Sequence, residues 1–324
     1  MSKFLVLGSN SNAGSYFIKW CIENGQEVMA TSRSVVNSPW YLAYDSTQVR
    51  TLQIDLNKDL EFLRKELCKF RPKYVINYVS QSMVAESWDS PQDWIRTNVT
   101  STQLLLDVLR DCDFLEKYIH FSTPEVYGNI TGEVSEDVIF NPSTPYAATR
   151  ATGDFFVKMW TKRYNLPGII TRAGNVYGAT QKLYRIIPKS VYYFLNSLKI
   201  PLHGGGHTRR NFVHSHDVAV ATYLLCTEGK IGDTYHISHN EYVSIRELVE
   251  LIAERVGVSF EEMVEVTEDR PGKDLNYSLG FEKLKKLGWA PTVSLKDGID
   301  EVIRWYEKNS QHLKLKDSVY EHKR

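Results

Sequence analysis

The sequence predicts an α/β fold, in which a doubly wound parallel sheet carries a second, smaller lobe towards the C-terminus. The first half of the chain alternates short apolar runs with helix-like patterns, as parallel strands joined by crossover helices do. A glycine-containing loop directly follows the first apolar run. After residue 175 the pattern becomes irregular, because glycines and prolines interrupt the apolar runs. A length of 324 residues suits one large α/β unit with a second lobe.

The individual elements follow from these patterns. Short apolar runs predict the strands of the large sheet, at 4–7, 27–30, 51–54, 74–78, 118–122 and 169–172. Amphipathic patterns predict helices at 14–24, 60–69, 98–110, 146–164, 244–256 and 293–308. We expect the sheet domain to span 1–174, with a segment near 211–237 returning to it, and 175–324 to form mainly the second lobe. The last dozen residues are polar, and we expect them to fray.

The composition narrows the class of protein. The 39 basic and 39 acidic side chains give no reason to expect a nucleic-acid partner. No segment approaches the roughly 20 apolar residues that cross a bilayer, so we expect no membrane partner. The four cysteines are scattered, which favours reduced thiols in a cytoplasmic protein. Four histidines between residues 203 and 216 match no common zinc pattern, and we expect no metal site.

The loop between the first strand and its helix predicts a dinucleotide site. It reads Gly8-Ser9-Asn10-Ser11-Asn12-Ala13-Gly14. Glycines let backbone N–H groups approach a pyrophosphate, and the helix N-terminus adds a favourable partial charge. Ser11 stands where the usual loop has a further glycine. The motif alone also fits a polar turn before a helix, but its place between a strand and a helix favours the cofactor.

The end of the second strand indicates which dinucleotide is bound. NAD-preferring enzymes place a carboxylate there, whereas this chain has Ser32 and Arg33, which suit a 2′-phosphate. We therefore expect NADP, with NAD as the second choice; the alternative is that Arg33 is a solvated loop cation. Asp55 is expected near the adenine or, equally, at a helix N-cap. The full expected cofactor set is Gly8, Asn10, Ser11, Asn12, Ala13, Gly14, Ser32, Arg33, Asp55, Leu56, Tyr78, Ser80, Tyr146 and Arg150.

A second motif carries reactive groups. The strand at 118–122 delivers Thr123 and Glu125 to its carboxyl end, where ligands bind in open α/β sheets. Tyr146 and Arg150 lie one turn apart on one face of the following helix. A phenol beside a fixed positive charge loses its proton more easily, so this set suits reversible oxidation of a sugar alcohol. The alternative is that the four residues only cap a strand and open a helix.

These residues resemble the extended short-chain dehydrogenase/reductase family, with a Rossmann-type fold, and within it the nucleotide-sugar 4,6-dehydratases. The resemblance covers nearly the whole chain, through motifs at 122–128, 141–146, 175–178, 210–213, 269–274 and 287–289. The C-terminal half is nearest to dehydratases of glucose nucleotides, whereas Gln81-Ser82 is nearer to the mannose-nucleotide branch. Two departures stand out: Arg150 replaces the family's lysine, and Pro124 replaces the aspartate that protonates the departing hydroxyl in glucose-nucleotide dehydratases.

The resemblance implies a reaction. Tyr146 would take the proton of the sugar's C4 hydroxyl, Thr123 would hydrogen-bond O4, and Arg150 would hold the cofactor ribose and lower the pKa of Tyr146. Glu125 would then remove the C5 proton, and water would leave from C6. The product is a 4-keto-6-deoxy sugar, and the cofactor is recycled. The residues expected to bind the nucleotide-diphosphate sugar are Gln81, Ser82, Glu125, Asn175, Arg185, Arg210 and Arg270.

The resemblance also implies a homodimer, paired through the helices at 98–110 and 146–164. The apolar side chains available for pairing are Leu104, Leu105, Phe155 and Phe156, although burial within one subunit would use the same residues.

Three alternatives remain open from the sequence. The first two share the fold: a nucleotide-sugar 4-epimerase and a nucleotide-glucuronate decarboxylase. The third is a catalytically weakened protein that keeps the cofactor, which the changes at Ser11, Pro124 and Arg150 would allow.

Overall fold

A seven-stranded sheet forms the centre of the computed structural model, which describes residues 1–34, 39–129, 132–268 and 278–322. Its strand order is β11-β7-β5-β4-β1-β2-β3, and every neighbouring pair is parallel. The strands are β1 (Lys3–Leu7), β2 (Glu27–Ser32), β3 (Arg50–Gln53), β4 (Tyr74–Asn77), β5 (Lys117–Ser122), β7 (Gly168–Ala173) and β11 (Thr234–Ile237). The predicted α/β fold is confirmed, and all six predicted strands lie in this sheet.

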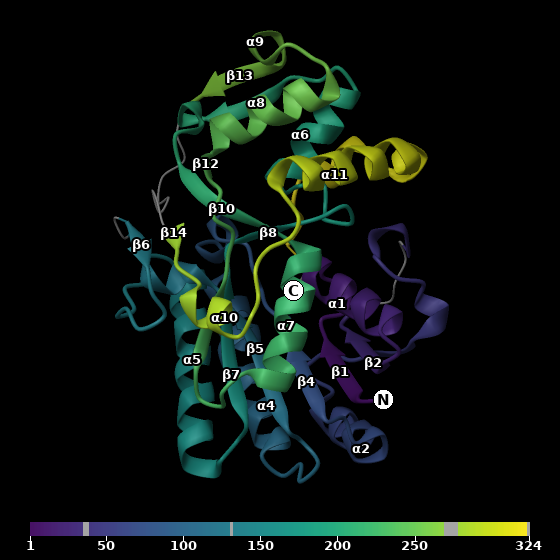
Figure 1. The fold of residues 1–324 in the computed structure, drawn as a ribbon, viewed down its shortest axis with the longest axis vertical. Helices are drawn as coiled ribbons and strands as arrows, with labels where there is room; N and C mark the ends of the chain where they lie inside the picture. The colour runs from purple at the N-terminus through teal and green to yellow at the C-terminus, as the bar shows by residue number, and fades with distance from the viewer. Residues whose placement is uncertain (35–38, 130–131, 269–277, 323–324) are drawn as a thin grey trace.

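Helices cover both faces of the sheet (Figure 1). One face carries α1 (Asn12–Glu23) and α7 (Ser215–Glu228), and the other carries α2 (Leu60–Phe70), α4 (Ser101–Leu109) and α5 (Pro145–Tyr164). Phe4 and Leu5 of β1 therefore point into different hydrophobic clusters, and both side chains are fully buried. A strand buried on both faces has to be continuously apolar, which is why β1 could be identified from its sequence.

The predicted helix at 98–110 begins earlier than expected and is not uniform. It opens as α3 (Pro91–Trp94), passes through one π-helical stretch at Ile95–Thr100, and continues as α4. Asn98 lies buried within the π-helical stretch. Its amide pairs with both backbone groups of Gln81, at 2.9 and 3.0 Å, and donates to Thr149 Oγ1 at 3.1 Å. The wider π-helical turn thus directs the polar side chain of Asn98 into the interior, at a position where a regular helix would carry an apolar residue.

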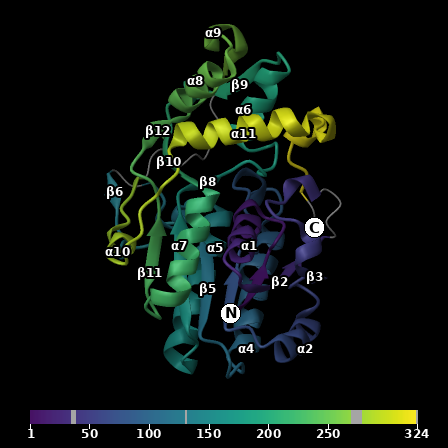
Figure 2. The same ribbon diagram turned by 45° about the vertical axis from the view of Figure 1, so that its right-hand side comes forward.

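A second packed unit lies beyond the carboxyl ends of the strands (Figures 1 and 2). Its core is formed by α6 (Ile186–Leu195), α8 (Ile245–Val256) and α11 (Leu295–Asn309). The remaining short elements are β6 (Glu133–Val134), β8 (Asn175–Tyr177), β9 (Ile200–His203), β10 (Arg209–His214), β12 (Tyr242–Ser244), α9 (Phe260–Met263), β13 (Val264–Thr267), β14 (Ser278–Leu279) and α10 (Glu282–Lys286). Strand β11 and helix α7 pack with the large sheet, and the division into domains at residue 174 stays a prediction.

As far as residue 322 the C-terminal segment packs against the rest of the protein, so the expectation that it frays is wrong for this described part. After α11 it forms two short 3-10 turns, Ser310–His312 and Leu315–Ser318. Leu313 joins the apolar core of the second unit, and Ser318 is buried as well. The segment is polar and has no periodic pattern, but the buried side chains of Leu313 and Ser318 hold it against the second unit. In the described part of the chain, no helix is long and apolar enough to cross a membrane.

Candidate active site

Two clefts meet at the carboxyl ends of the strands. The first has a volume of about 740 Å³ and extends towards the second unit, and the other, of about 600 Å³, extends over the ends of β2 and β3. Both are bordered by Asn10, Ser11, Tyr78, Ser80 and Ser82, so they adjoin each other. A ligand with two ends can therefore occupy both, with its middle over the loop that follows β1.

Close backbone approach explains the glycines of that loop. Gly8 has φ +82°, and a Cβ there would lie 3.1 Å from the carbonyl carbon of Tyr78. A Cβ on Gly14 would lie 2.6 Å from the carbonyl oxygen of Gly8, so helix α1 can start this close to β1 only with glycine. Ser11 is the N-cap of α1: its hydroxyl accepts from Gly14 N at 3.1 Å and donates to Gly8 O at 2.7 Å. The serine thus stabilises the loop.

The cleft over β2 and β3 contains the residues expected at the adenosine end. Ser32, Arg33, Asp55 and Leu56 all border it. The Ser32 hydroxyl donates to the carbonyl of Ser34 at 2.6 Å. Asp55 accepts from the backbone N–H of Asn57 at 3.0 Å, which closes an Asx turn. The N-cap of α2 is Asp59, so the capping alternative for Asp55 is wrong.

The four candidate catalytic residues converge on the first cleft. Thr123 directly follows β5. It caps a 3-10 turn by accepting from Glu125 N at 3.3 Å, and Pro124 is the first residue of that turn. Thr144 caps α5, so that Pro145 and then Tyr146 open the helix. Proline is favoured at the first position of both, because it has no N–H to leave unpaired. Thr123, Glu125, Tyr146 and Arg150 all border this cleft.

Burial governs the electrostatics of Tyr146. It raises the pKa of the phenol, and the positive charge of Arg150 and a hydrogen bond with Thr123 lower that pKa without cancelling the rise. The expected lowering by Arg150 is therefore present, but the net direction is upward. The Glu125 carboxylate adds to the rise. With a raised pKa, the Tyr146 phenol loses its proton only at high pH or when a further group stabilises the phenolate.

Arg150 is buried and contacts the end of β5 through one of its two terminal nitrogens. It is 1% exposed, and its Nη2 donates to the carbonyl of Phe121 and lies 3.4 Å from His120 Nε2. Beneath it, His120 Nε2 lies 3.6 Å from Asp154, which also pairs with Arg172 at 2.7 Å. Burial lowers the pKa of His120 to about 3, so this histidine is neutral and can accept from the guanidinium.

The cleft offers unpaired polar atoms to a ligand. Within the described chain, Arg150 Nη1, Ser122 Oγ and Asn10 Oδ1 are buried without a hydrogen-bond partner. All three residues border the first cleft. Buried polar groups nearly always find partners, so these atoms fit a polar ligand such as the ribose and amide of a nicotinamide nucleotide. The glycines of the β1 loop, whose added Cβ atoms would collide, fit its pyrophosphate.

The expected sugar-nucleotide residues divide between the clefts. Ser82, Asn175, Arg185 and Arg210 border the first cleft, and Arg185 Nη2 donates to Ser82 Oγ at 3.1 Å. Gln81 borders the other cleft, on the dinucleotide side. Arg270 lies outside the described residues.

Sequence reasoning missed several residues that border the clefts. Lys182 and Tyr184 border both clefts, and Lys189 and Thr208 border the first. They lie between elements or on surface turns of a helix, where no motif or period marks them.

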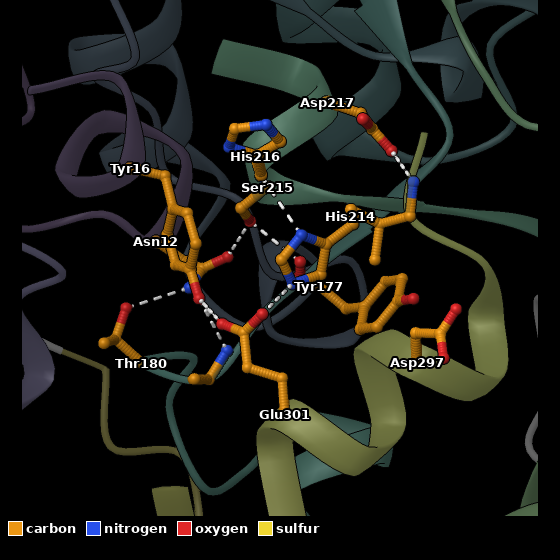
Figure 3. Close-up of polar contacts among 12 residues, drawn as sticks. Asn12, Tyr16, Tyr177, Thr180, His214, Ser215, His216, Asp217, Asp297 and Glu301 are labelled. Carbon is orange, nitrogen blue, oxygen red and sulfur yellow. Dashed lines mark hydrogen bonds and ion pairs between the residues drawn. The ribbon is translucent and has the colours of Figure 1, made fainter. Parts of the chain in front are cut away.

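A polar cluster joins the dinucleotide loop to the second unit (Figure 3). Asn12, the first residue of α1, donates to Thr180 Oγ1 at 3.1 Å and accepts from the Ser215 hydroxyl. One turn later, Tyr16 points at Glu301 of α11, which also lies 3.4 Å from His214 Nε2. Burial lowers the pKa of His214. Among the described residues, no three His, Cys, Asp or Glu side chains are grouped to hold a metal ion.

Comparisons with known proteins agree with this geometry. A family model described as GDP-mannose 4,6 dehydratase matches residues 5–302. The low-salt glycan biosynthesis protein Agl12 of Haloferax volcanii is 32% identical, over 93% of this chain and 97% of that protein. The dTDP-glucose 4,6-dehydratase of Escherichia coli is 31% identical, over 95% and 94% of the respective chains. The crystal structure of DesIV, a dTDP-glucose 4,6-dehydratase from Streptomyces venezuelae with NAD and TYD bound, superposes with a TM-score of 0.87 at 29% identity, covering 96% of this chain and 98% of that one.

Proposed function

The chain belongs to the GDP-mannose 4,6-dehydratase family, and from this premise we propose that it removes water from a nucleotide-diphosphate hexose to give the 4-keto-6-deoxy sugar. The membership confirms the family and the enzyme class expected from the motifs, a nucleotide-sugar 4,6-dehydratase. The observation that carries the specific reaction is the meeting of Thr123, Glu125 and Tyr146 on one cleft. A homodimer and a cytoplasmic location are part of the proposal.

The cofactor is a nicotinamide adenine dinucleotide, held by the β1 loop and the ends of β2 and β3. When bound, it supplies the transient oxidation at C4 and the reduction at C6. We propose NADP over NAD, because Arg33 borders the adenosine end of the cleft and β2 ends without a carboxylate.

The protein's own groups move the protons. Tyr146 accepts the proton of the C4 hydroxyl while Thr123, bonded to the same phenol, holds O4 in line. The buried charge of Arg150 stabilises the phenolate form of Tyr146 that accepts this proton. Once C4 is a ketone, the C5–H bond becomes acidic, and Glu125 is the carboxylate on this cleft that takes its proton.

The departing C6 hydroxyl also needs a proton. The family's aspartate is replaced by Pro124, which has no proton to give. Glu125 follows Pro124 in the sequence, borders the same cleft, and is protonated after it has taken the C5 proton. We propose that this single carboxyl serves as base and then as acid.

Mass measurement tests the reaction directly. The purified protein is incubated with nucleotide-diphosphate hexoses in D2O, with and without added NADP, and the masses of the products are measured by mass spectrometry. We expect a product lighter by one water, labelled with deuterium at C5, without net reduction of cofactor. Glu125→Gln should slow turnover by about 10²–10⁴-fold, whereas Glu133→Gln, at an exposed carboxylate on β6, should not.

Other outcomes would overturn the proposal. An isomer of unchanged mass would show a 4-epimerase, and loss of carbon dioxide from a glucuronate would show a decarboxylase. Substrate binding without any product, in the wild type and in Glu125→Gln alike, would show a weakened cofactor-binding protein.

A further inference from the structure

The C-terminal segment 310–322 borders the cleft over the ends of β2 and β3, which we call the dinucleotide cleft. It leaves the end of α11 in the second unit and descends to the sheet unit, where the chain ends (Figure 2). Residues from this segment make up a substantial part of the cleft wall, namely His312, Lys316, Asp317, Val319, Tyr320 and Glu321. The β1 loop and the ends of β2 and β3 border the same cleft. The cleft is therefore bordered by two parts of the chain that are far apart in sequence.

The near half of the segment is anchored to the second unit. Leu313 packs into the core built by α6, α8 and α11. Ser318 is 3% exposed, and its hydroxyl lies 3.2 Å from Tyr193 Oη on α6. These contacts hold the segment against the second unit independently of any ligand.

The far half is anchored on the sheet side. His322 Nε2 lies 2.8 Å from Asp93 of α3, and its ring stacks on the fully buried Trp94 at a centroid distance of 4.9 Å. Tyr320 packs edge-on against Tyr184, a residue that borders both clefts, at 5.1 Å. The segment is thus attached to the second unit at one end and to α3 of the sheet unit at the other.

The segment also places charge on the cleft. Lys316 is exposed and borders the cleft, where the ligand would carry phosphates. Two residues earlier, Lys314 is also exposed but does not border it. Asp317 and Glu321 border the cleft as well, so the wall is mixed in charge. The Asp317 carboxylate is engaged with the backbone N–H of Lys314, at 3.3 Å.

We propose that segment 310–322 is part of the dinucleotide-binding site and retains the cofactor between turnovers. The inference rests on the proposed function, because a reaction that takes up and returns the same reducing equivalent has no need to exchange its cofactor. Lys316 adds attraction for the phosphates, and the His322 contacts hold the wall closed. Release of the dinucleotide then requires the far anchor to detach, so its dissociation is slow.

Cofactor release tests the proposal without any substrate. The full-length protein is loaded with reduced dinucleotide, and loss of its fluorescence is followed after mixing with an excess of the oxidised form. His322→Ala should raise the dissociation rate about tenfold, since one anchor is lost. Lys316→Glu should weaken the affinity about fivefold or more, whereas the matched Lys314→Glu should leave both quantities within about twofold of the wild type.

The outcomes separate cleanly. If His322→Ala and Lys316→Glu both release cofactor at the wild-type rate, the segment does not retain it and the proposal is wrong. The melting temperature shows whether His322→Ala still folds. If it does not, Lys316→Glu alone tests the proposal, because it changes an exposed side chain. Because release is measured without sugar nucleotide, a failure of the dehydratase assay leaves this result intact.

Discussion

The hydroxyl of Tyr16 donates a 2.6 Å hydrogen bond to Glu301 Oε1, across 285 residues of sequence. The same hydroxyl accepts from the backbone N–H of Ala179 at 3.1 Å. Tyr16 lies in the helix that begins at the dinucleotide loop, and Glu301 lies in α11, from which the C-terminal segment leaves. This pair therefore couples the start of the cofactor site to the second unit.

Removal of that hydroxyl should cost stability. Tyr16→Phe leaves the Ala179 N–H and the Glu301 carboxylate short of a partner, and we expect a loss of about 1–2 kcal/mol in the free energy of unfolding. Urea denaturation measures it. The control compares two glutamates of α11: Glu301→Ala should destabilise, and the exposed Glu307→Ala should not. Equal stability of these two variants would contradict the coupling.

The pH dependence of catalysis should report on Arg150. Its charge lowers the pKa of Tyr146, which burial has raised, so Arg150→Gln removes the compensating effect. The acidic limb of the profile of kcat/KM against pH should then move to higher pH, because a more basic phenol needs a higher pH to lose its proton.

Two variants on the same helix complete that test. Arg150→Lys keeps the charge and should restore part of the shift, and Lys162→Gln, in the last turn of α5, should leave the profile unchanged. A limb at the wild-type pH in Arg150→Gln would show that Tyr146 is not the titrating base.

Cofactor preference should depend on Arg33. A charged hydrogen bond to a 2′-phosphate contributes about 1.5–3 kcal/mol, which corresponds to roughly tenfold or more in affinity. Arg33→Ala should therefore weaken NADP and leave NAD unchanged in calorimetric titrations. Lys58→Ala, at an exposed lysine that does not border the cleft, serves as the matched control. Tighter binding of NAD than of NADP by the wild type would overturn the choice of cofactor.

Acid should destabilise the protein through its buried histidines. Burial lowers the pKa of both His120 and His236 to about 3, whereas a histidine of the unfolded chain titrates near 6.5. Between these values the unfolded state binds more protons, so stability falls as the pH drops below about 6.5. At pH 5 each histidine should cost about 2 kcal/mol relative to pH 8.

Urea denaturation at pH 8 and pH 5 measures this loss. His236→Gln should reduce the difference between the two pH values by about 2 kcal/mol, because the contribution of this ring is gone. His207→Gln, at an exposed histidine, should leave it as in the wild type. An unchanged difference in His236→Gln would show that the folded protein protonates this ring.

The proposed dimer has a defined face. Leu104 is 41% exposed and Phe155 is 51% exposed, on the neighbouring helices α4 and α5, whereas Leu105 is fully buried in the subunit's own core. Of the four residues expected at the dimer face, these two are exposed, and Phe156 is half-buried. The double variant Leu104→Glu/Phe155→Glu should give a monomer in light scattering, and Phe62→Glu, equally exposed on α2, should not. A monomeric wild type would refute the dimer.

Much of the sheet unit could be predicted because its signals are local. β1 is an uninterrupted apolar run, and Thr144-Pro145 marks the start of α5 through capping alone. The candidate catalytic residues follow directly from these elements. Asn98 shows the limit, because its inward direction comes from a π-helical stretch that the pattern of residues does not encode.

The C-terminal wall of the dinucleotide cleft could not be predicted for a different reason. His322 and Asp93 are 229 residues apart, and neither belongs to a motif or to an apolar period. The same holds for Tyr16 and Glu301. Such contacts depend on the finished arrangement of both units, whereas secondary-structure signals reflect only the nearest residues.

The position of the last residues has a practical consequence for handling the protein. β1 begins at Lys3, at the end of the strands opposite to the clefts, whereas His322, near the other end of the chain, lies against α3. An affinity tag or fusion partner attached at the C-terminus would pull on the His322 anchor, and a tag at the N-terminus would leave it alone. Preparations that differ only in which end is tagged should differ in how much dinucleotide they carry through purification.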